Sequence, residues 1–182
     1  MEKKKFDFNF IVLAFITFCF IGWLYEVIWE AAIGHGFVNR GFLYGPYLPV
    51  YGFGVLILYF SLRKIMNKKI QIGKINITPI IVFLIILIMV SVIEYFTSVM
   101  LEKIFNIELW NYSKDILNIN GRVSLRNSSI LAAGAMVMLY VIWKLLEILY
   151  EKVNNKVWNI FKYIVIIVVS VDFICTIISY IK

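Results

Sequence analysis

Residues 77–100 read ITPIIVFLIILIMVSVIEYFTSVM, and Glu94 is the one charged residue in this stretch. A transmembrane helix needs about 20 apolar residues, because it rises about 1.5 Å per residue and the hydrocarbon core is about 30 Å thick. The stretch therefore predicts a membrane-crossing helix. It sets the expected fold class as an all-α integral membrane protein.

The composition of the whole chain agrees with this prediction. Of 182 residues, 62% are hydrophobic and 16% are charged, and the mean hydropathy is +0.88. A soluble chain averages about 45–50% apolar and about 25% charged residues. A soluble domain of this size could not bury so much apolar surface, and disordered chains have low hydrophobicity. We expect a single transmembrane domain over residues 1–182.

Four further segments complete the expected topology. Residues 8–28, 130–149 and 157–181 each have the length and apolarity of a span. Residues 45–62 are less regular, because they begin GPYLPVYG and each proline removes a backbone donor. Their helical part, 49–62, is only about 20 Å long. The sequence thus predicts about five transmembrane helices with a broken or re-entrant glycine/proline segment before the second. Four crossings and a re-entrant loop is the alternative.

The positions of the basic residues predict the orientation. Bases gather in three places that fall on one side of the membrane if the chain crosses five times. They are Lys3, Lys4 and Lys5; Arg63, Lys64, Lys68, Lys69 and Lys74; and Lys152 and Lys156. Because bases are retained on the cytoplasmic side, we expect a multi-pass cell-membrane protein with a cytoplasmic N-terminus. The net charge of +7 is then explained by topology and membrane lipids, and no nucleic acid is expected as a partner.

Three carboxylates lie inside predicted spans. At about 1.5 Å per residue, Glu26 lies roughly 27 Å, Glu94 roughly 26 Å and Asp172 roughly 22 Å from the inner end of its span. All three therefore fall in the outer half of the membrane, where Arg40 and Arg122 approach from the same side. Ionisable residues at such depth usually mark function. We predict that the five line a polar cavity, and the alternative is that they pair to hold the helices together.

The other reactive side chains give weaker signals. Cys19 and Cys175 lie in apolar stretches as packing residues, and the single histidine, His35, lies between two glycines as a turn residue. No metal cluster or cofactor is predicted. Glu102 is expected to pair with Lys103 or water.

Several motifs resemble a known family. They are GWLYE at 22–26, NRGFLYGP at 39–46, Pro49 with Tyr51-Gly52, Glu94-Tyr95, LEK at 101–103, LWNYS at 109–113 and the segment 118–125. With them the chain resembles the type IV ABC-transporter permease family of small bacterial integral membrane proteins. That family typically has Trp-Asp-Tyr-Ser where this chain has Asn111, so one carboxylate is missing here. The resemblance implies transport and, because no P-loop is present, a separate ATPase subunit.

Three functions follow from these observations. The first is a permease or substrate-binding membrane subunit with an outward-side polar cavity, either homo-oligomeric or bound to an ATPase. The second is an intramembrane enzyme that acts on a lipid or lipid-linked substrate through acid–base carboxylates and phosphate-binding arginines. The third is a membrane scaffold. The residues that we predict to bind substrate are Glu26, Asn39, Arg40, Tyr44, Tyr51, Glu94, Trp110, Tyr112, Arg122 and Asp172.

Overall fold

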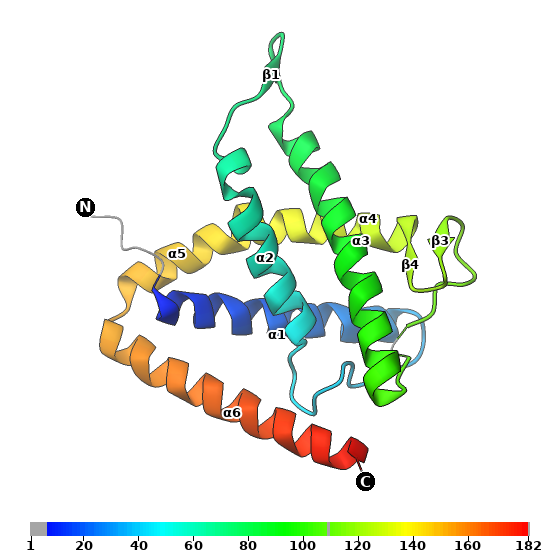
Figure 1. Cartoon of the computed structure of the whole chain (residues 1–182). Helices are drawn as coiled ribbons and strands as arrows, with labels where there is room; N and C mark the ends of the chain where they lie inside the picture. The colour runs from blue at the N-terminus through cyan, green and yellow to red at the C-terminus, as the bar shows by residue number, and fades with distance from the viewer. Residues whose placement is uncertain (1–6, 109, 182) are drawn as a thin grey trace. The chain divides into compact units, whose positions relative to one another are not determined.

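The computed structural model describes residues 7–108 and 110–181 (Figure 1). Lys3, Lys4, Lys5 and Leu109, which the sequence analysis used, lie outside these ranges. The helices are α1 (Phe8–Ala32), α2 (Pro49–Met66), α3 (Thr78–Phe105), α4 (Leu125–Val137), a π-helical turn η1 (Met138–Ile142), α5 (Trp143–Lys152) and α6 (Asn155–Ile181). Two short hairpins pair β1 (Gln71–Ile72) with β2 (Ile75–Asn76) and β3 (Asn118–Ile119) with β4 (Val123–Ser124).

In the described part of the chain, five helical segments are long and apolar enough to cross a membrane. They are Phe8–Ala32, Pro49–Met66, Thr78–Phe105, Leu125–Lys152 and Asn155–Tyr180. This confirms the predicted all-α fold class. The fourth segment starts at residue 125 instead of 130, because the Ser124 side chain accepts a hydrogen bond from the Asn127 amide and caps α4.

Two compact units divide the chain. One contains the residues up to Leu56 and those from Ile142 on, and the other is Ile57–Val141. The expected single domain over 1–182 stays a prediction.

Aromatic side chains hold the first unit together. The Phe10 ring meets the rings of Trp143 and Tyr150 edge-on, each with centroids 5.3 Å apart. Trp158 of α6 stacks on Tyr150 and donates its indole N–H to the Tyr150 carbonyl. The Tyr150 hydroxyl donates to Asp7, which also caps α1. These contacts join α1, α5 and α6 near the start of α1.

The second unit is built on α3 and α4, which pack against each other. Val82 and Ile86 of α3 and Ala132 of α4 are fully buried in it. The hairpin β1–β2 precedes α3, and the hairpin β3–β4 leads into α4 (Figure 1). This unit thus contains α3, α4, the hairpin before each of them and the part of α2 from Ile57 on.

Residues 33–48, which join α1 to α2, form neither helix nor strand. Gly34 and Gly36 take positive φ values of 93° and 70°, a conformation that glycine adopts at little cost. The Leu48 amide donates to the Cys19 carbonyl, so the end of the segment is fastened to α1. A re-entrant path through the membrane stays a prediction.

Candidate functional site

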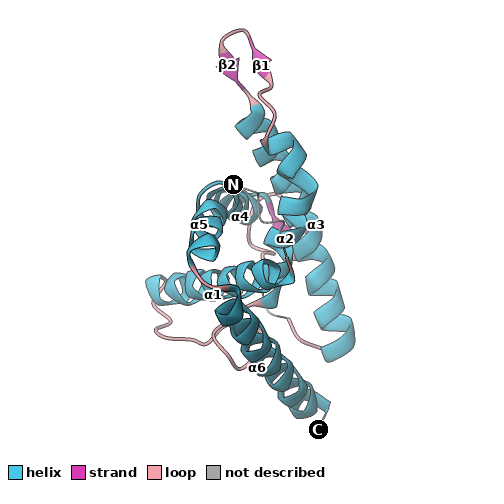
Figure 2. Ribbon diagram, turned by 90° about the vertical axis from the view of Figure 1, so that its left-hand side faces the viewer, coloured by secondary structure: helices cyan, strands magenta, loops and turns pink. Residues whose placement is uncertain are grey.

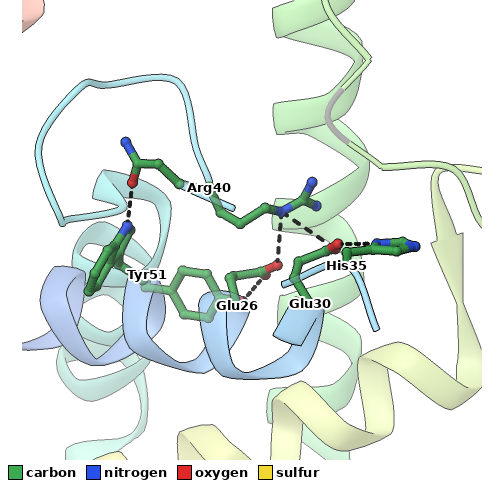
Figure 3. A network of polar contacts seen from close by, with 7 residues as sticks. Glu26, Glu30, His35, Arg40 and Tyr51 are labelled. Atoms are coloured by element: carbon green, nitrogen blue, oxygen red, sulfur yellow. Dashed lines mark hydrogen bonds and ion pairs between the residues drawn. The ribbon is translucent and has the colours of Figure 1, made fainter. Parts of the chain in front are cut away.

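The first unit contains a network of ionisable side chains where α1 ends, made of Glu26, Glu30, His35, Arg40 and Tyr51 (Figure 3). We call it the Arg40 network. Nε of Arg40 lies 3.8 Å from Glu26 Oε2 and 3.7 Å from Glu30 Oε1. The Tyr51 hydroxyl donates to Glu26 Oε1 at 2.6 Å, and His35 Nδ1 lies 2.7 Å from Glu30 Oε2. One guanidinium is therefore shared between two carboxylates, each of which has a second partner.

Helical spacing and one glycine create this arrangement. Glu26 and Glu30 are four residues apart on α1 and so lie on the same helix face. A Cβ at Gly22 would lie 2.2 Å from the Tyr51 ring, so the missing side chain lets α2 approach α1 closely. This approach brings the Tyr51 hydroxyl to Glu26.

The side chains of the Arg40 network are only partly buried. The side chains of Arg40, Glu26 and Glu30 are 30%, 27% and 13% exposed. The two Arg40–carboxylate contacts are longer than the 2.7–2.9 Å of a strong charge-assisted hydrogen bond. With a neutral imidazole at His35, the network carries one positive and two negative charges. Such a site can exchange its internal contacts for those of a charged or amphoteric ligand.

A second set of contacts holds the loop that carries Arg40. The Trp23 indole N–H donates to Asn39 Oδ1 at 2.7 Å, and Asn39 Nδ2 donates to the Tyr44 carbonyl at 3.0 Å. Because Asn39 precedes Arg40 directly, these bonds fix the backbone from which the guanidinium extends. Asn39 thus positions Arg40.

Asp172 of α6 holds the same loop from another helix. Its carboxylate accepts hydrogen bonds from the Tyr44 amide at 3.1 Å, the Gly45 amide at 2.8 Å and the Tyr47 hydroxyl at 2.6 Å. Burial and the neighbouring Asp172 raise the pKa of the Tyr47 phenol, which therefore remains a donor. Asp172 thus fastens residues 44–47 to α6.

The second unit contains a different carboxylate site. Glu94 is 8% exposed and accepts from Asn127 Nδ2 at 2.9 Å and from Ser128 Oγ at 3.0 Å. Asn127 and Ser128 lie in the first turn of α4, where the helix dipole favours a negative charge. Glu94, Asn127 and Ser128 form what we call the Glu94 network. Both oxygens of this carboxylate bind neutral donors.

Arg122 contacts two residues of α3 in the same unit. It forms an ion pair with Glu102, and its Nη1 donates to Ser98 Oγ at 2.9 Å. The expectation that Glu102 pairs with Lys103 or water is therefore wrong. Arg122 is distant from Glu102 in the sequence. The loop that follows α3 brings the chain back to the C-terminal end of this helix, where Glu102 lies. The Trp110 indole donates to the Arg122 carbonyl, and the Tyr112 amide donates to the Gly121 carbonyl, so both residues shape this return.

The predicted site residues thus fall into two groups. Glu26, Asn39, Arg40, Tyr44, Tyr51 and Asp172 belong to the first unit, and Glu94, Trp110, Tyr112 and Arg122 to the second. Arg40 contacts Glu26 as expected. The set of site residues did not contain Glu30 and His35, although the four-residue step from Glu26 to Glu30 was a usable signal. A single cavity lined by both groups stays a prediction.

Among residues 7–108 and 110–181, no group of three or more His, Cys, Asp or Glu side chains is arranged to hold a metal ion. The Arg40 network offers a guanidinium, two carboxylates, a hydroxyl and an imidazole for contacts with a ligand.

One comparison with known proteins gives a match. The model of the family described as "Putative ABC-transporter type IV" matches residues 13–177. No curated protein and no solved structure matches the chain. The family match and the five membrane-span-like helices together identify a multi-pass, transport-related membrane protein.

Proposed function

Because the chain belongs to the type IV ABC-transporter family, we propose that it is a substrate-binding membrane subunit of an ABC transport system. The substrate site in this proposal is the Arg40 network. The sequence contains no Walker A motif, so ATP hydrolysis is assigned to a separate subunit.

The observation that carries the proposal is the sharing of Arg40 between Glu26 and Glu30. An arginine that served only to join helices would be expected to form short, bidentate bonds to one carboxylate. Here both contacts are 3.7 Å or longer and all three side chains are partly exposed. A small polar solute can bind at this place and replace the long contacts with short ones.

The wider set of predicted site residues extends this proposal. Asn39 and Asp172 position the loop that carries Arg40, and Tyr51 holds Glu26.

An experimental structure of the protein purified from its native membrane tests the substrate site. We expect a small polar solute within hydrogen-bond distance of Arg40. A phospholipid head group there would instead indicate the lipid-directed enzyme. Short direct bonds from Arg40 to Glu26 and Glu30, with nothing bound between them, would indicate a scaffold.

Variants give an independent test. Native mass spectrometry of the purified protein should detect the bound solute in the wild type and lose it in Arg40→Ala. Arg126→Ala is the matched control, because Arg126 is exposed on α4 of the other unit and belongs to neither network. Equal solute occupancy in the two variants would contradict the assignment of the site.

We also propose that the N-terminus and the basic segment Arg63–Lys74 lie in the cytoplasm. In a Cys175→Ser background, a cysteine placed at Lys69 should not react with a membrane-impermeant maleimide in intact cells. It should react after the membrane is permeabilised. Efficient labelling from outside would reverse the orientation.

A further inference from the structure

The hairpin β1–β2 has one face made entirely of isoleucine. Gln71 pairs with Asn76 and Ile72 with Ile75, and the Ile77 amide donates to the Ile70 carbonyl, which extends the same register. Side chains alternate between the two faces of a strand. Ile70, Ile72, Ile75 and Ile77 therefore share one face, while Gln71 and Asn76 lie on the other.

This isoleucine face is not covered within its own unit. Ile72 is 68% exposed, Ile75 is 67% exposed and Ile70 is 36% exposed. Around the face the chain carries only positive charge, because no Asp or Glu occurs between Arg63 and Glu94. The bases are Arg63, Lys64, Lys68, Lys69 and Lys74. The surface is therefore an apolar patch surrounded by cations.

Thr78 fastens the base of the hairpin to the first turn of α3. Its hydroxyl donates to the Lys68 carbonyl at 2.9 Å and accepts from the Ile70 amide at 2.8 Å. The Thr78 amide donates to Asn76 Oδ1 at 3.1 Å. In Figures 1 and 2 the hairpin accordingly extends beyond the start of α3, away from the helix. Gly73, with φ 61° at the first position of the two-residue turn, closes its tip.

This fixed direction places the tip outside the lipid. The 28 residues of α3 extend about 42 Å at about 1.5 Å per residue, which exceeds the hydrocarbon thickness of about 30 Å. We place Thr78, at the start of this apolar helix, at the hydrocarbon boundary. Ile75 lies three residues further out, about 10 Å along a strand. The headgroup region is only about 5–8 Å thick on each side. As long as the Thr78 hydrogen bonds hold the hairpin in this direction, we expect its tip to lie beyond the lipid headgroups.

The positive charge around the isoleucine face distinguishes between two remaining partners, a second copy of the hairpin and a soluble protein. A second copy of the hairpin would bring five more positive charges against the first five, which is unfavourable. A soluble protein with acidic residues is complementary to the cations and can bury the isoleucines.

We propose that the isoleucine face of β1–β2 docks a soluble protein that offers an apolar groove bordered by carboxylates. That this partner is the separate ATPase subunit rests on the proposed function. The docking element is a short hairpin that extends from the start of α3, and its specificity comes from the isoleucine face together with the neighbouring lysines.

Site-specific photo-crosslinking in native membranes tests the proposal. The photoreactive residue p-benzoylphenylalanine is placed at Ile72 or Ile75, and in control variants at Gln71, on the opposite face, or at Ile160, which is 63% exposed on α6. We expect positions 72 and 75 to give one crosslinked soluble polypeptide whose peptides include a Walker A motif. The yield at positions 71 and 160 should be at least tenfold lower. A Lys68→Glu, Lys69→Glu, Lys74→Glu variant should lose the crosslink.

The other outcomes separate this inference from the proposed function. Crosslinks from positions 72 and 75 to phospholipid, to a second copy or to nothing overturn the docking proposal. If an ATPase still co-purifies with the wild type in that case, the proposed function survives. If no ATPase co-purifies and the crosslinked soluble protein lacks a Walker A motif, docking stands and both the ATPase identity and the proposed function fail.

Discussion

The Arg40 network and the Glu94 network bind carboxylates in opposite ways. Glu94 is buried, and its two oxygens accept from Asn127 and Ser128 at 2.9 and 3.0 Å. Glu26 and Glu30 are partly exposed and share Arg40 at 3.8 and 3.7 Å. The Glu94 carboxylate accepts from neutral donors at bonding distance. Glu26 and Glu30 each have one partner at bonding distance and share a full opposite charge at longer range.

This difference separates a structural carboxylate from a candidate ligand site. If the Glu94 carboxylate is removed, Asn127 and Ser128 each lose their acceptor. Water does not easily replace it, because the site is buried. A buried polar group that loses its partner costs about 1–3 kcal/mol. The Arg40 network can exchange its contacts with water or a solute at little cost, because exposed ion pairs contribute about 0–1 kcal/mol. The same residue type thus serves stability in one unit and, we propose, recognition in the other.

Replacing Glu94 should have the largest effect on stability. Glu94→Ala leaves the Asn127 amide and the buried Ser128 hydroxyl without their acceptor and removes a negative charge from the start of α4. We expect a loss of about 3 kcal/mol in the free energy of unfolding, as the sum of two unsatisfied groups. Thermal unfolding in detergent, followed by circular dichroism, measures it.

Glu94→Gln is the matched control for this prediction. It keeps one carbonyl acceptor and the side-chain volume, so it should lose clearly less stability than Glu94→Ala. If both variants unfolded like the wild type and lost the bound solute, Glu94 would belong to the ligand site and the contrast between the networks would be wrong.

Replacing Asp172 should have the second largest effect on stability. Asp172→Ala removes the acceptor for the Tyr44 and Gly45 amides and the Tyr47 hydroxyl, which are only partly buried. We expect a loss of about 2 kcal/mol and faster proteolysis within residues 33–48. Thr176→Val serves as control, because its hydroxyl makes the weaker 3.3 Å contact to the same carboxylate. Unchanged proteolysis in Asp172→Ala would show that the loop is held by other contacts.

Much of the fold could be predicted from the sequence, because membrane spans depend on length and apolarity alone. The run from residue 77 to 100 sufficed to predict α3, and Pro49 marked the start of α2. The ends of the spans were less predictable. The fourth span begins at Leu125 because Ser124 caps it, and this polar start lies before the apolar run that signals the helix.

The site was less predictable, because it depends on which helix faces meet. Depth along each span pointed to Glu26 and Glu94 but could not distinguish their partners. Glu94 accepts from Asn127 and Ser128, two neutral residues that carry no signal in a search for charges. His35 was interpreted as a turn residue from its flanking glycines, yet its imidazole also contacts Glu30. Such contacts follow from the path of the loop, which periodicity does not describe.

The smallest stability effect is expected where the effect on ligand binding is largest. In a double-mutant cycle with Glu26→Gln, Arg40→Gln and the double variant, the coupling energy for unfolding should stay below about 1 kcal/mol, as measured for exposed pairs. Breaking a buried, structural ion pair would cost about 3–5 kcal/mol. Each single variant should nevertheless lose the solute that native mass spectrometry detects in the wild type. A coupling of several kcal/mol with solute still bound would make Arg40 a structural residue like Glu94. The low value with lost solute would place recognition in the first unit, where the Arg40 guanidinium lies 3.8 and 3.7 Å from two carboxylates.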